Sequence, residues 1–224
     1  MSPQAKKFKS TSPSKLEQNL GYSMQAVNFV LTRAKLQAAN YDYFDPQKKA
    51  ATFEIFAKQL NNYQPQTEYD ALYKLAEAHK TPLDQCVYDG VRPVQHLVTG
   101  IAADLGFDSE MDRYRIIAAL AMMAGCGNCQ EESIVAFLYL HDMKVRAHRI
   151  SAKPDHAFVV VGMAPNADFE DYRTWGTDAV ICDPWSQGFQ KGNAKFGTYP
   201  ASQFNSVMGS LLGAITIEAC FPAP

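Results

Sequence analysis

Cys129 is the residue of this chain best placed to act as a nucleophile. It follows a turn that contains two glycines, residues 125–128 (GCGN), and it opens a predicted helix that continues to about residue 141. The first turn of a helix has unpaired backbone N–H groups and a partial positive charge. Both features favour a thiolate, and the N–H groups can also bind the oxyanion of a tetrahedral intermediate. Glu131 and Glu132 oppose the thiolate, because nearby negative charge disfavours it, although both suit a helix N-terminus.

A nucleophilic thiol also needs a base, and the base needs a group that orients it. His156 lies 27 residues after Cys129, at the start of an expected strand over residues 157–161. Asp183 lies another 27 residues on, at the end of an expected strand over residues 179–182, where Pro184 stops the strand. Neighbouring strands would bring the two side chains together near the start of the Cys129 helix, and Trp185 could cover the pair and exclude water. The sequence therefore predicts a Cys129–His156–Asp183 triad.

Three segments carry a resemblance to a known superfamily. Residues 127–133 (GNCQEES), 155–161 (DHAFVVV) and 180–185 (VICDPW) resemble, in this order, the Cys–His–Asp core of papain-like and transglutaminase-like proteins. They look most like the compact effector cysteine proteases and glutamine deamidases of pathogenic bacteria. The resemblance covers about residues 125–186 and does not extend to the helical N-terminal half.

The resemblance implies a hydrolase that acts on a protein, such as a host protein, through a thioacyl intermediate and without any cofactor or metal. The expected reaction is either deamidation of glutamine, which is slightly preferred, or cleavage of a peptide bond. If an amine attacked in place of water, the same site would be a transglutaminase. The chain departs from the pattern in two ways. Met122 and Met123 stand near the place of the oxyanion-binding Gln of papain, and Gln130 replaces the Trp that follows the cysteine in transglutaminases. Gln130 or Asn128 could supply the missing oxyanion donor.

Other classes of protein are compatible with parts of the same pattern. Cys126 and Cys129 form a C-x-x-C pair, which is a cue for a thiol-disulfide oxidoreductase. That fold has a strand directly before the motif, whereas residues 116–124 here read as a helix. A zinc site could recruit further ligands at His141, His148 or Cys182, but the second paired cluster of ligands that is usual in structural zinc sites is missing. A binding module without catalysis, with the helical half as its interaction surface, is a third alternative.

The hydrophobic pattern predicts the elements that would position the site. Apolar residues recur at helical spacing in several segments, and the later part of the chain changes to short β-type runs. Helices are expected over residues 24–39, 45–60, about 67–76, 93–105, 110–124, 129–141 and 200–208, and strands over 145–150, 157–161, 179–182 and 214–219. Helices followed by an antiparallel sheet make an α+β fold.

Three parts of the chain are expected. Residues 1–20, with Lys among Ser and Pro, look like a flexible tail. Residues 21–107 form a helical N-terminal part, and residues 108–224 form a papain-like catalytic core in which the nucleophile helix packs on the sheet. The two parts are expected to make one compact unit.

Composition limits the classes of function. The formal net charge of −2 supplies no overall basic field to attract nucleic acid. No apolar run reaches the ~18–20 residues of a membrane-spanning helix, and no signal peptide is recognisable. These features predict a protein made in a cytoplasm, and the resemblance implies a bacterial cytoplasm with secretion into a host cell. The odd count of five cysteines argues against a disulfide framework.

Overall fold

The computed structural model describes residues 12–36, 92–107, 109–153, 156–188, 197–212 and 216–222. Helices and one antiparallel sheet make up this part of the chain, so the fold is mixed α+β, as the hydrophobic pattern predicts. The expected helices over residues 45–60 and 67–76 lie outside the described residues.

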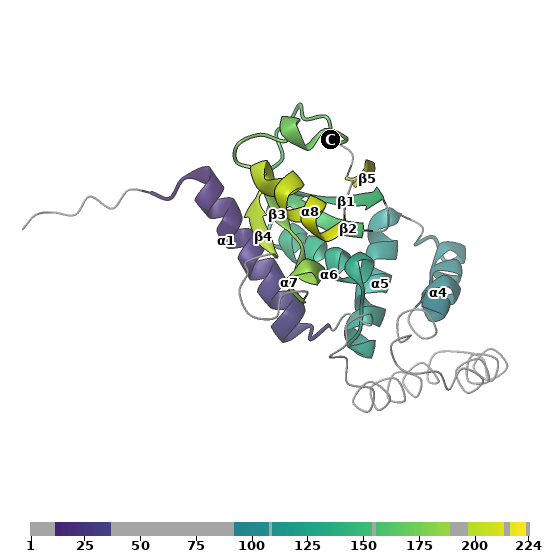
Figure 1. Ribbon diagram of the computed structural model, residues 1–224. Helices are drawn as coiled ribbons and strands as arrows, with labels where there is room; N and C mark the ends of the chain where they lie inside the picture. Colours follow the sequence, from purple (N-terminus) through teal and green to yellow (C-terminus); the bar gives the residue numbers. More distant parts are fainter. Residues whose placement is uncertain are drawn as a thin grey trace, which may run out of the picture.

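A single five-stranded sheet forms the centre of the molecule (Figure 1). The strand order is β4-β3-β2-β1-β5, and every neighbouring pair is antiparallel. The strands are β1 (Ala147–Lys153), β2 (His156–Val161), β3 (Val180–Cys182), β4 (Thr198–Pro200) and β5 (Thr216–Phe221). All six residues of β2 are buried, because this central strand is covered on both faces.

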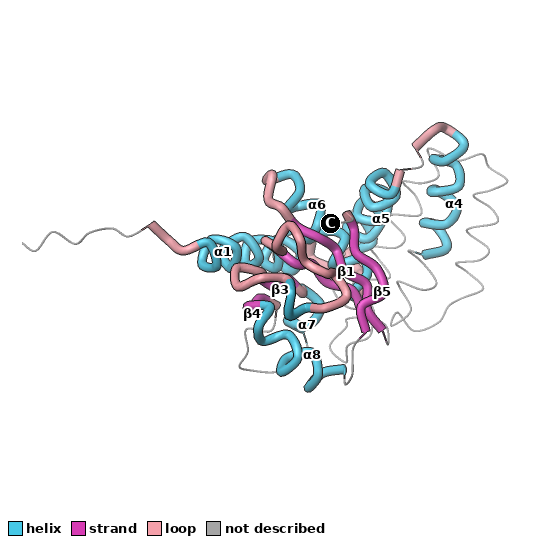
Figure 2. The backbone as a smooth tube through the Cα atoms, turned by 90° about the horizontal axis from the view of Figure 1, so that it is seen from above, coloured by secondary structure: helices cyan, strands magenta, loops and turns pink. Residues whose placement is uncertain are grey.

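Helices cover the sheet and flank it, and in the view from above α1, α6 and α5 are spread along one side of it (Figure 2). The longer ones are α1 (Lys15–Asn28), continued by a π-helical turn over Phe29–Arg33, and α4 (Arg92–Asp104), α5 (Glu110–Ala124), α6 (Cys129–Asp142) and α8 (Phe204–Leu212). Shorter helical turns occur at Tyr172–Thr174, at α7 (Pro184–Gly188) and at Ala201–Gln203.

Two hydrophobic cores lie on opposite faces of the sheet, because successive side chains of a strand point to opposite faces. Val159 and Val161 of β2 pack with apolar side chains of α1, α5 and α6. Phe158 and Val160 pack instead with Trp175 and with side chains around α8. Helix α6 is thereby fixed on one face of the sheet, with its first residue at a defined end of the strands.

Helix α1 belongs to the same compact unit as the sheet. Its side chains reach the strands directly: Ser23 Oγ donates to the Ile181 carbonyl at 3.1 Å, and Asn19 Nδ2 donates to the Asp178 carbonyl at 2.8 Å. The helix begins at Lys15, where Ser14 and Glu17 form a capping box. The expectation of a flexible tail through residue 20 is therefore wrong for residues 15–20, since a capping signal and an apolar face outweigh the Lys and Ser content.

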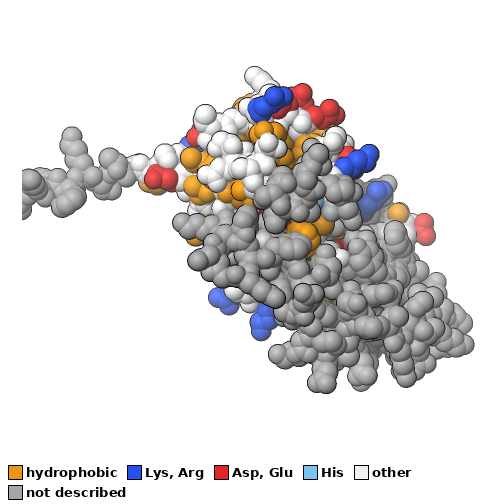
Figure 3. Space-filling view, in the orientation of Figure 1, with side chains coloured by type: hydrophobic (Ala, Val, Ile, Leu, Met, Phe, Trp, Pro, Cys, Tyr) orange, Lys and Arg blue, Asp and Glu red, His pale blue; other side chains and the backbone are white. Residues whose placement is uncertain are grey.

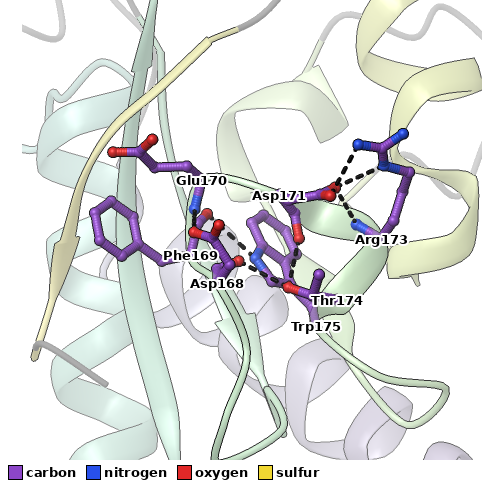
Figure 4. A network of polar contacts seen from close by, with 7 residues as sticks. All are labelled: Asp168, Phe169, Glu170, Asp171, Arg173, Thr174 and Trp175. Atoms are coloured by element: carbon purple, nitrogen blue, oxygen red, sulfur yellow. Dashed lines mark hydrogen bonds and ion pairs between the residues drawn. The ribbon is translucent and has the colours of Figure 1, made fainter.

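The connection between β2 and β3 is held by its own polar contacts (Figure 4). Arg173 donates to both carboxylate oxygens of Asp171, at 2.7 and 2.8 Å, and Trp175 Nε1 donates to the Phe169 carbonyl at 3.2 Å. Trp175 is fully buried in the core beneath. This connection leads the chain back to β3, which ends at Cys182, directly before Asp183.

Most expected elements agree with the structure, and the differences concern ends and short pieces. Helices over 93–105, 110–124 and 129–141 correspond to α4, α5 and α6, and the four expected strands correspond to β1, β2, β3 and β5. Strand β4 and helix α7 were not expected from the sequence. Both are too short to show a period, and α7 begins at the proline that was interpreted only as the end of a strand.

The surface agrees with the near-neutral composition. In the face shown in Figure 3, basic and acidic side chains of the described residues are interspersed, without a continuous area of one sign. Within the described ranges, no helix combines the length and the apolar character that crossing a lipid bilayer requires.

Candidate functional site

The start of α6 is built by two glycines that perform different tasks. Gly125 ends α5 in the left-handed conformation, with φ of 66°, which glycine adopts without steric cost. Gly127 lies directly against α6: a Cβ there would stand 2.9 Å from Glu131 Cβ and 3.6 Å from Glu132 Cγ. The turn can therefore approach the helix only with glycine at this position, and Cys129 becomes the first helical residue.

The first turn of α6 is capped as its sequence predicts. Asn128 is the N-cap, and its backbone N–H donates to Glu131 Oε2 at 2.9 Å within a capping box. Cys129 is not disulfide-bonded, and it is 9% exposed. Of the two candidate oxyanion donors, Asn128 is buried and engaged in the cap, while Gln130 is half-buried on the same turn. The identity of the oxyanion donor stays a prediction.

His156 and Asp183 meet at the end of the sheet. Because β2 and β3 are antiparallel and Val159 pairs with Cys182, the start of β2 lies beside the end of β3. His156 Nε2 is 2.8 Å from Asp183 Oδ2, and both side chains are completely shielded from solvent. The second carboxylate oxygen, Asp183 Oδ1, accepts the backbone N–H of Ser186 at 3.2 Å. The carboxylate is thus fixed by α7 and in turn orients the imidazole.

Cys129 lies close enough to act on His156. Burial by itself lowers the pKa of His156, but the charge and hydrogen bond of Asp183 and the neighbouring Cys129 side chain raise it to about 10. The other ring nitrogen, His156 Nδ1, is buried, and no hydrogen bond reaches it within the described residues. The imidazole therefore has one nitrogen bound to a carboxylate and one left for a reaction partner, and its charged form is favoured at neutral pH.

Aromatic side chains enclose the histidine. The Trp185 ring centroid is 5.0 Å from that of His156, with the planes tilted by 50°. The Phe158 ring stacks with the His156 ring at a centroid distance of 5.8 Å. Trp185 is 6% exposed. It lies beside the histidine as the sequence reasoning expected, on the short helix α7 that follows Asp183.

Glu132 is a further titratable side chain of this region. From the sequence it was expected only to disfavour the Cys129 thiolate and to suit the start of the helix. It is 1% exposed, and among the described residues its Oε2 has no hydrogen-bond partner. Burial first, and then the charges of Asp183, Cys129 and Glu131, raise its pKa well above the usual value, while His156 acts in the opposite direction. The spacing of three residues from Cys129 on one helix was the signal that could have identified it.

The described cysteines differ in whether they form a disulfide. Cys126 is in a disulfide, although the odd cysteine count argued against a disulfide framework, whereas Cys129, Cys182 and Cys220 are not disulfide-bonded. Cys126 and Cys129 are therefore not bonded to each other. Burial raises the pKa of the Cys182 thiol to about 12, which suits a core residue.

The histidines named as zinc candidates are separated from any ligand cluster. His148 Nδ1 is 2.9 Å from the Pro222 carbonyl, and His141 is on the last turn of α6, beside Asp142. Among the described residues, no group of three or more His, Cys, Asp or Glu side chains is arranged to hold a metal ion.

A cavity of about 590 Å³ lies away from these residues. Its walls include Lys15 and Tyr22 of α1, Lys144 and Arg146 after α6, and Asp178 before β3. Cys129 and this cavity are at opposite ends of α6, whose 14 residues span about 21 Å. The cavity is thus separate from the Cys129 end of the helix.

Comparisons with protein-family models, with curated proteins and with solved structures found no match for this chain.

Proposed function

We propose that this chain is a papain-like thiol hydrolase that acts on a protein substrate, with Cys129 as nucleophile, His156 as base and acid, and Asp183 as the orienting residue. The Cys129 thiolate attacks the carbonyl carbon of an amide, and the amine or ammonia leaves with a proton from the His156 imidazolium. Water then attacks the thioacyl carbon and gives its proton to His156. The C–S bond breaks, the acid is released and the thiolate is restored.

One observation carries this proposal: the fully buried 2.8 Å contact between His156 Nε2 and Asp183 Oδ2, with Nδ1 left for Cys129. An ion pair buried in this way is costly unless its geometry is good, and such pairs gather at functional sites. The first turn of α6 adds backbone N–H groups for the oxyanion. These features support a nucleophilic thiol more than a structural cysteine.

The substrate class is proposed at two levels. A protein amide is the general substrate, and the side-chain amide of glutamine is our preferred one, so that the reaction is deamidation. Cleavage of a peptide bond and transfer to an amine use the same intermediate. A role as a secreted bacterial effector that modifies a host protein belongs to the same proposal and rests on the sequence resemblance.

The oxidoreductase alternative has less support. It requires Cys126 and Cys129 to form a disulfide with each other, but Cys126 is bonded to another cysteine and Cys129 is not in a disulfide. The element before the motif is α5, a helix, whereas the redox fold has a strand there.

The test is the rate of iodoacetamide alkylation of each cysteine against pH, read by mass spectrometry. We expect Cys129 to react much faster than Cys182 and Cys220 at pH 6–7, where an ordinary thiol with a pKa near ~8.5 is almost entirely protonated. Because His156 supplies the positive charge, the His156→Ala variant should lose this advantage. A Cys129 that reacts like an ordinary thiol in both proteins contradicts the proposal.

A second assay separates the reactions. Incubation with glutamine-containing proteins should release ammonia without shortening the chain if deamidation is correct. New chain ends would identify a protease instead, and the Cys129→Ala variant is the control for both.

A further inference from the structure

We propose that Glu132 is a positioning residue of the Cys129–His156–Asp183 site, that the fold keeps it uncharged, and that its uncharged state is what allows a thiolate at Cys129. This inference rests on the proposed function and deepens it.

The position and the burial of Glu132 are the first evidence that it is uncharged. Glu132 is three residues after Cys129 on α6, so both side chains lie on one side of the helix. The Gly127 turn closes over its side chain, with the ideal Cβ position of Gly127 3.6 Å from Glu132 Cγ. The residue is 1% exposed, and Oε2 has no hydrogen-bond partner in the part of the chain that the structure describes. Burying a carboxylate is costly when its oxygens are not fully hydrogen-bonded.

The neighbouring glutamate gives the contrast. Glu131 is also completely buried, but its Oε2 accepts the Asn128 backbone N–H at 2.9 Å in the capping box. A carboxylate at a helix N-cap is a favourable arrangement. Two adjacent buried glutamates thus have different environments: Glu131 Oε2 accepts a backbone N–H, whereas Glu132 Oε2 accepts no hydrogen bond from the described residues.

The titratable groups around Glu132 influence whether its carboxyl group is protonated. On its own helix these are Cys129 and Glu131, from β2 it is His156, and from the end of β3 it is Asp183. Helix α1, which also packs against α6, places the uncharged side chains Asn19 and Ser23 in the interior.

A count of formal charges shows why the proton on Glu132 matters. A Cys129 thiolate, a His156 imidazolium and an Asp183 carboxylate together carry one negative charge. Ionised Glu132 would add another inside the same buried region, and nearby negative charge disfavours a thiolate. A neutral acid at this position keeps the thiolate–imidazolium pair accessible.

The experiment compares the neutral isostere Glu132→Gln with the matched variant Glu131→Gln in the full chain. Infrared spectra at pH 7 should show the C=O stretch of a protonated carboxylic acid in the wild type. We expect this band to disappear in Glu132→Gln and to persist in Glu131→Gln. A wild type without the band, or a band that survives Glu132→Gln, overturns the proposal even if a variant folds poorly.

The second readout is the pH midpoint at which Cys129 alkylation slows on acidification. Since Gln copies the uncharged acid, Glu132→Gln should keep the wild-type midpoint. If Glu132 were ionised in the wild type, Glu132→Gln would remove a negative charge beside the thiolate and shift the midpoint to lower pH. A shift of one pKa unit is a tenfold change in the proton concentration at the midpoint. Such a shift contradicts the proposal.

The two proposals can fail separately. If the acid band behaves as expected but Cys129 shows no enhanced alkylation in any of these proteins, the hydrolase proposal fails and Glu132 has no thiolate to support. If alkylation is fast but the band is absent, the hydrolase proposal stands and the role of Glu132 is refuted.

Discussion

At the scale of single residues, the buried His156–Asp183 contact is the feature on which the chemistry depends. Histidine with an ordinary pKa near 6.5 would be largely neutral above pH 7, whereas Asp183 and Cys129 raise its pKa to about 10 against the effect of burial. The charged imidazole is therefore available over the physiological range. This makes Asp183 the residue whose removal should change the site most without removing a reacting atom.

Asp183→Asn keeps the shape of the side chain and removes its charge. We expect the pKa of His156 to fall, because burial then dominates, and amide hydrolysis to fall by about 10²–10⁴-fold, as in other triads that lose the orienting carboxylate. Titration of the His156 ring protons by NMR checks the first effect. An unchanged pKa would show that Asp183 does not govern the histidine.

The same contact makes a prediction about stability against pH. A histidine whose pKa is higher in the fold than in the unfolded chain stabilises the fold below pH 6.5, and this contribution is lost as pH rises towards about 10. The free energy of unfolding of the wild type should therefore fall between these pH values more steeply than that of Asp183→Asn. Urea titrations at several pH values measure it, and parallel curves for the two proteins would contradict it.

At the scale of elements, the turn before α6 sets where the nucleophile lies. Its sequence signal, two glycines before a helix with glutamates in the first turn, predicted where the helix begins, whereas the capping box of Asn128 with Glu131 was identified only in the structure. The contact that requires glycine at 127 was not readable, because it is made with side-chain atoms one turn into the helix.

Gly127→Ala should destabilise the protein and misplace the first turn of α6. The added Cβ would lie 2.9 Å from Glu131 Cβ, and overpacking of this kind costs about 1–3 kcal/mol. Gly21→Ala is the control: it lies in α1 with no atom within 4 Å of the new Cβ. Because alanine favours helix over glycine, this control should raise the melting temperature, by up to about 1 kcal/mol of stability. Equal effects of both changes would refute the close contact at Gly127.

At the scale of the whole molecule, α1 and the sheet form one folding unit. The helix is more than 150 residues from β3 in sequence, yet Asn19 and Ser23 bond to the backbone beside and within that strand. Polar contacts buried over such a distance in sequence resist separation of the parts. The N-terminal helix is therefore a structural part of the region that holds the site.

Asn19→Ala should lower the stability of the unit as a whole. It removes the donor to the Asp178 carbonyl, and a buried group that loses its partner costs about 1–3 kcal/mol. The two tryptophans, Trp175 and Trp185, lie in the second half of the chain, so their fluorescence reports on unfolding of the sheet region. The urea midpoint of this signal should fall in Asn19→Ala but not in the exposed control Met24→Ala. If the urea midpoint of the tryptophan fluorescence were the same in Asn19→Ala and in the wild type, α1 would unfold independently of the sheet.

The sequence by itself determined the local features. The helix that starts at Cys129, the antiparallel strands that start at His156 and end before Asp183, and the α+β class follow from periodicity, glycine and proline positions and caps, all of which act between residues close in the chain. Short elements such as β4 and α7 have no period to detect, and they form because neighbouring strands and helices supply their partners.

Only the tertiary structure decided which buried groups share one environment. The pairing of β2 with β3 brings His156 to Asp183, and the packing of α6 on the sheet brings Cys129 and Glu132 to both. From the sequence, Glu131 and Glu132 are equivalent acidic residues in a first turn. In the fold they differ, because Glu131 accepts a backbone N–H, whereas Glu132 is buried close to Asp183 and Cys129. Burial and the distance between charges depend on how distant segments pack, and local sequence does not encode them.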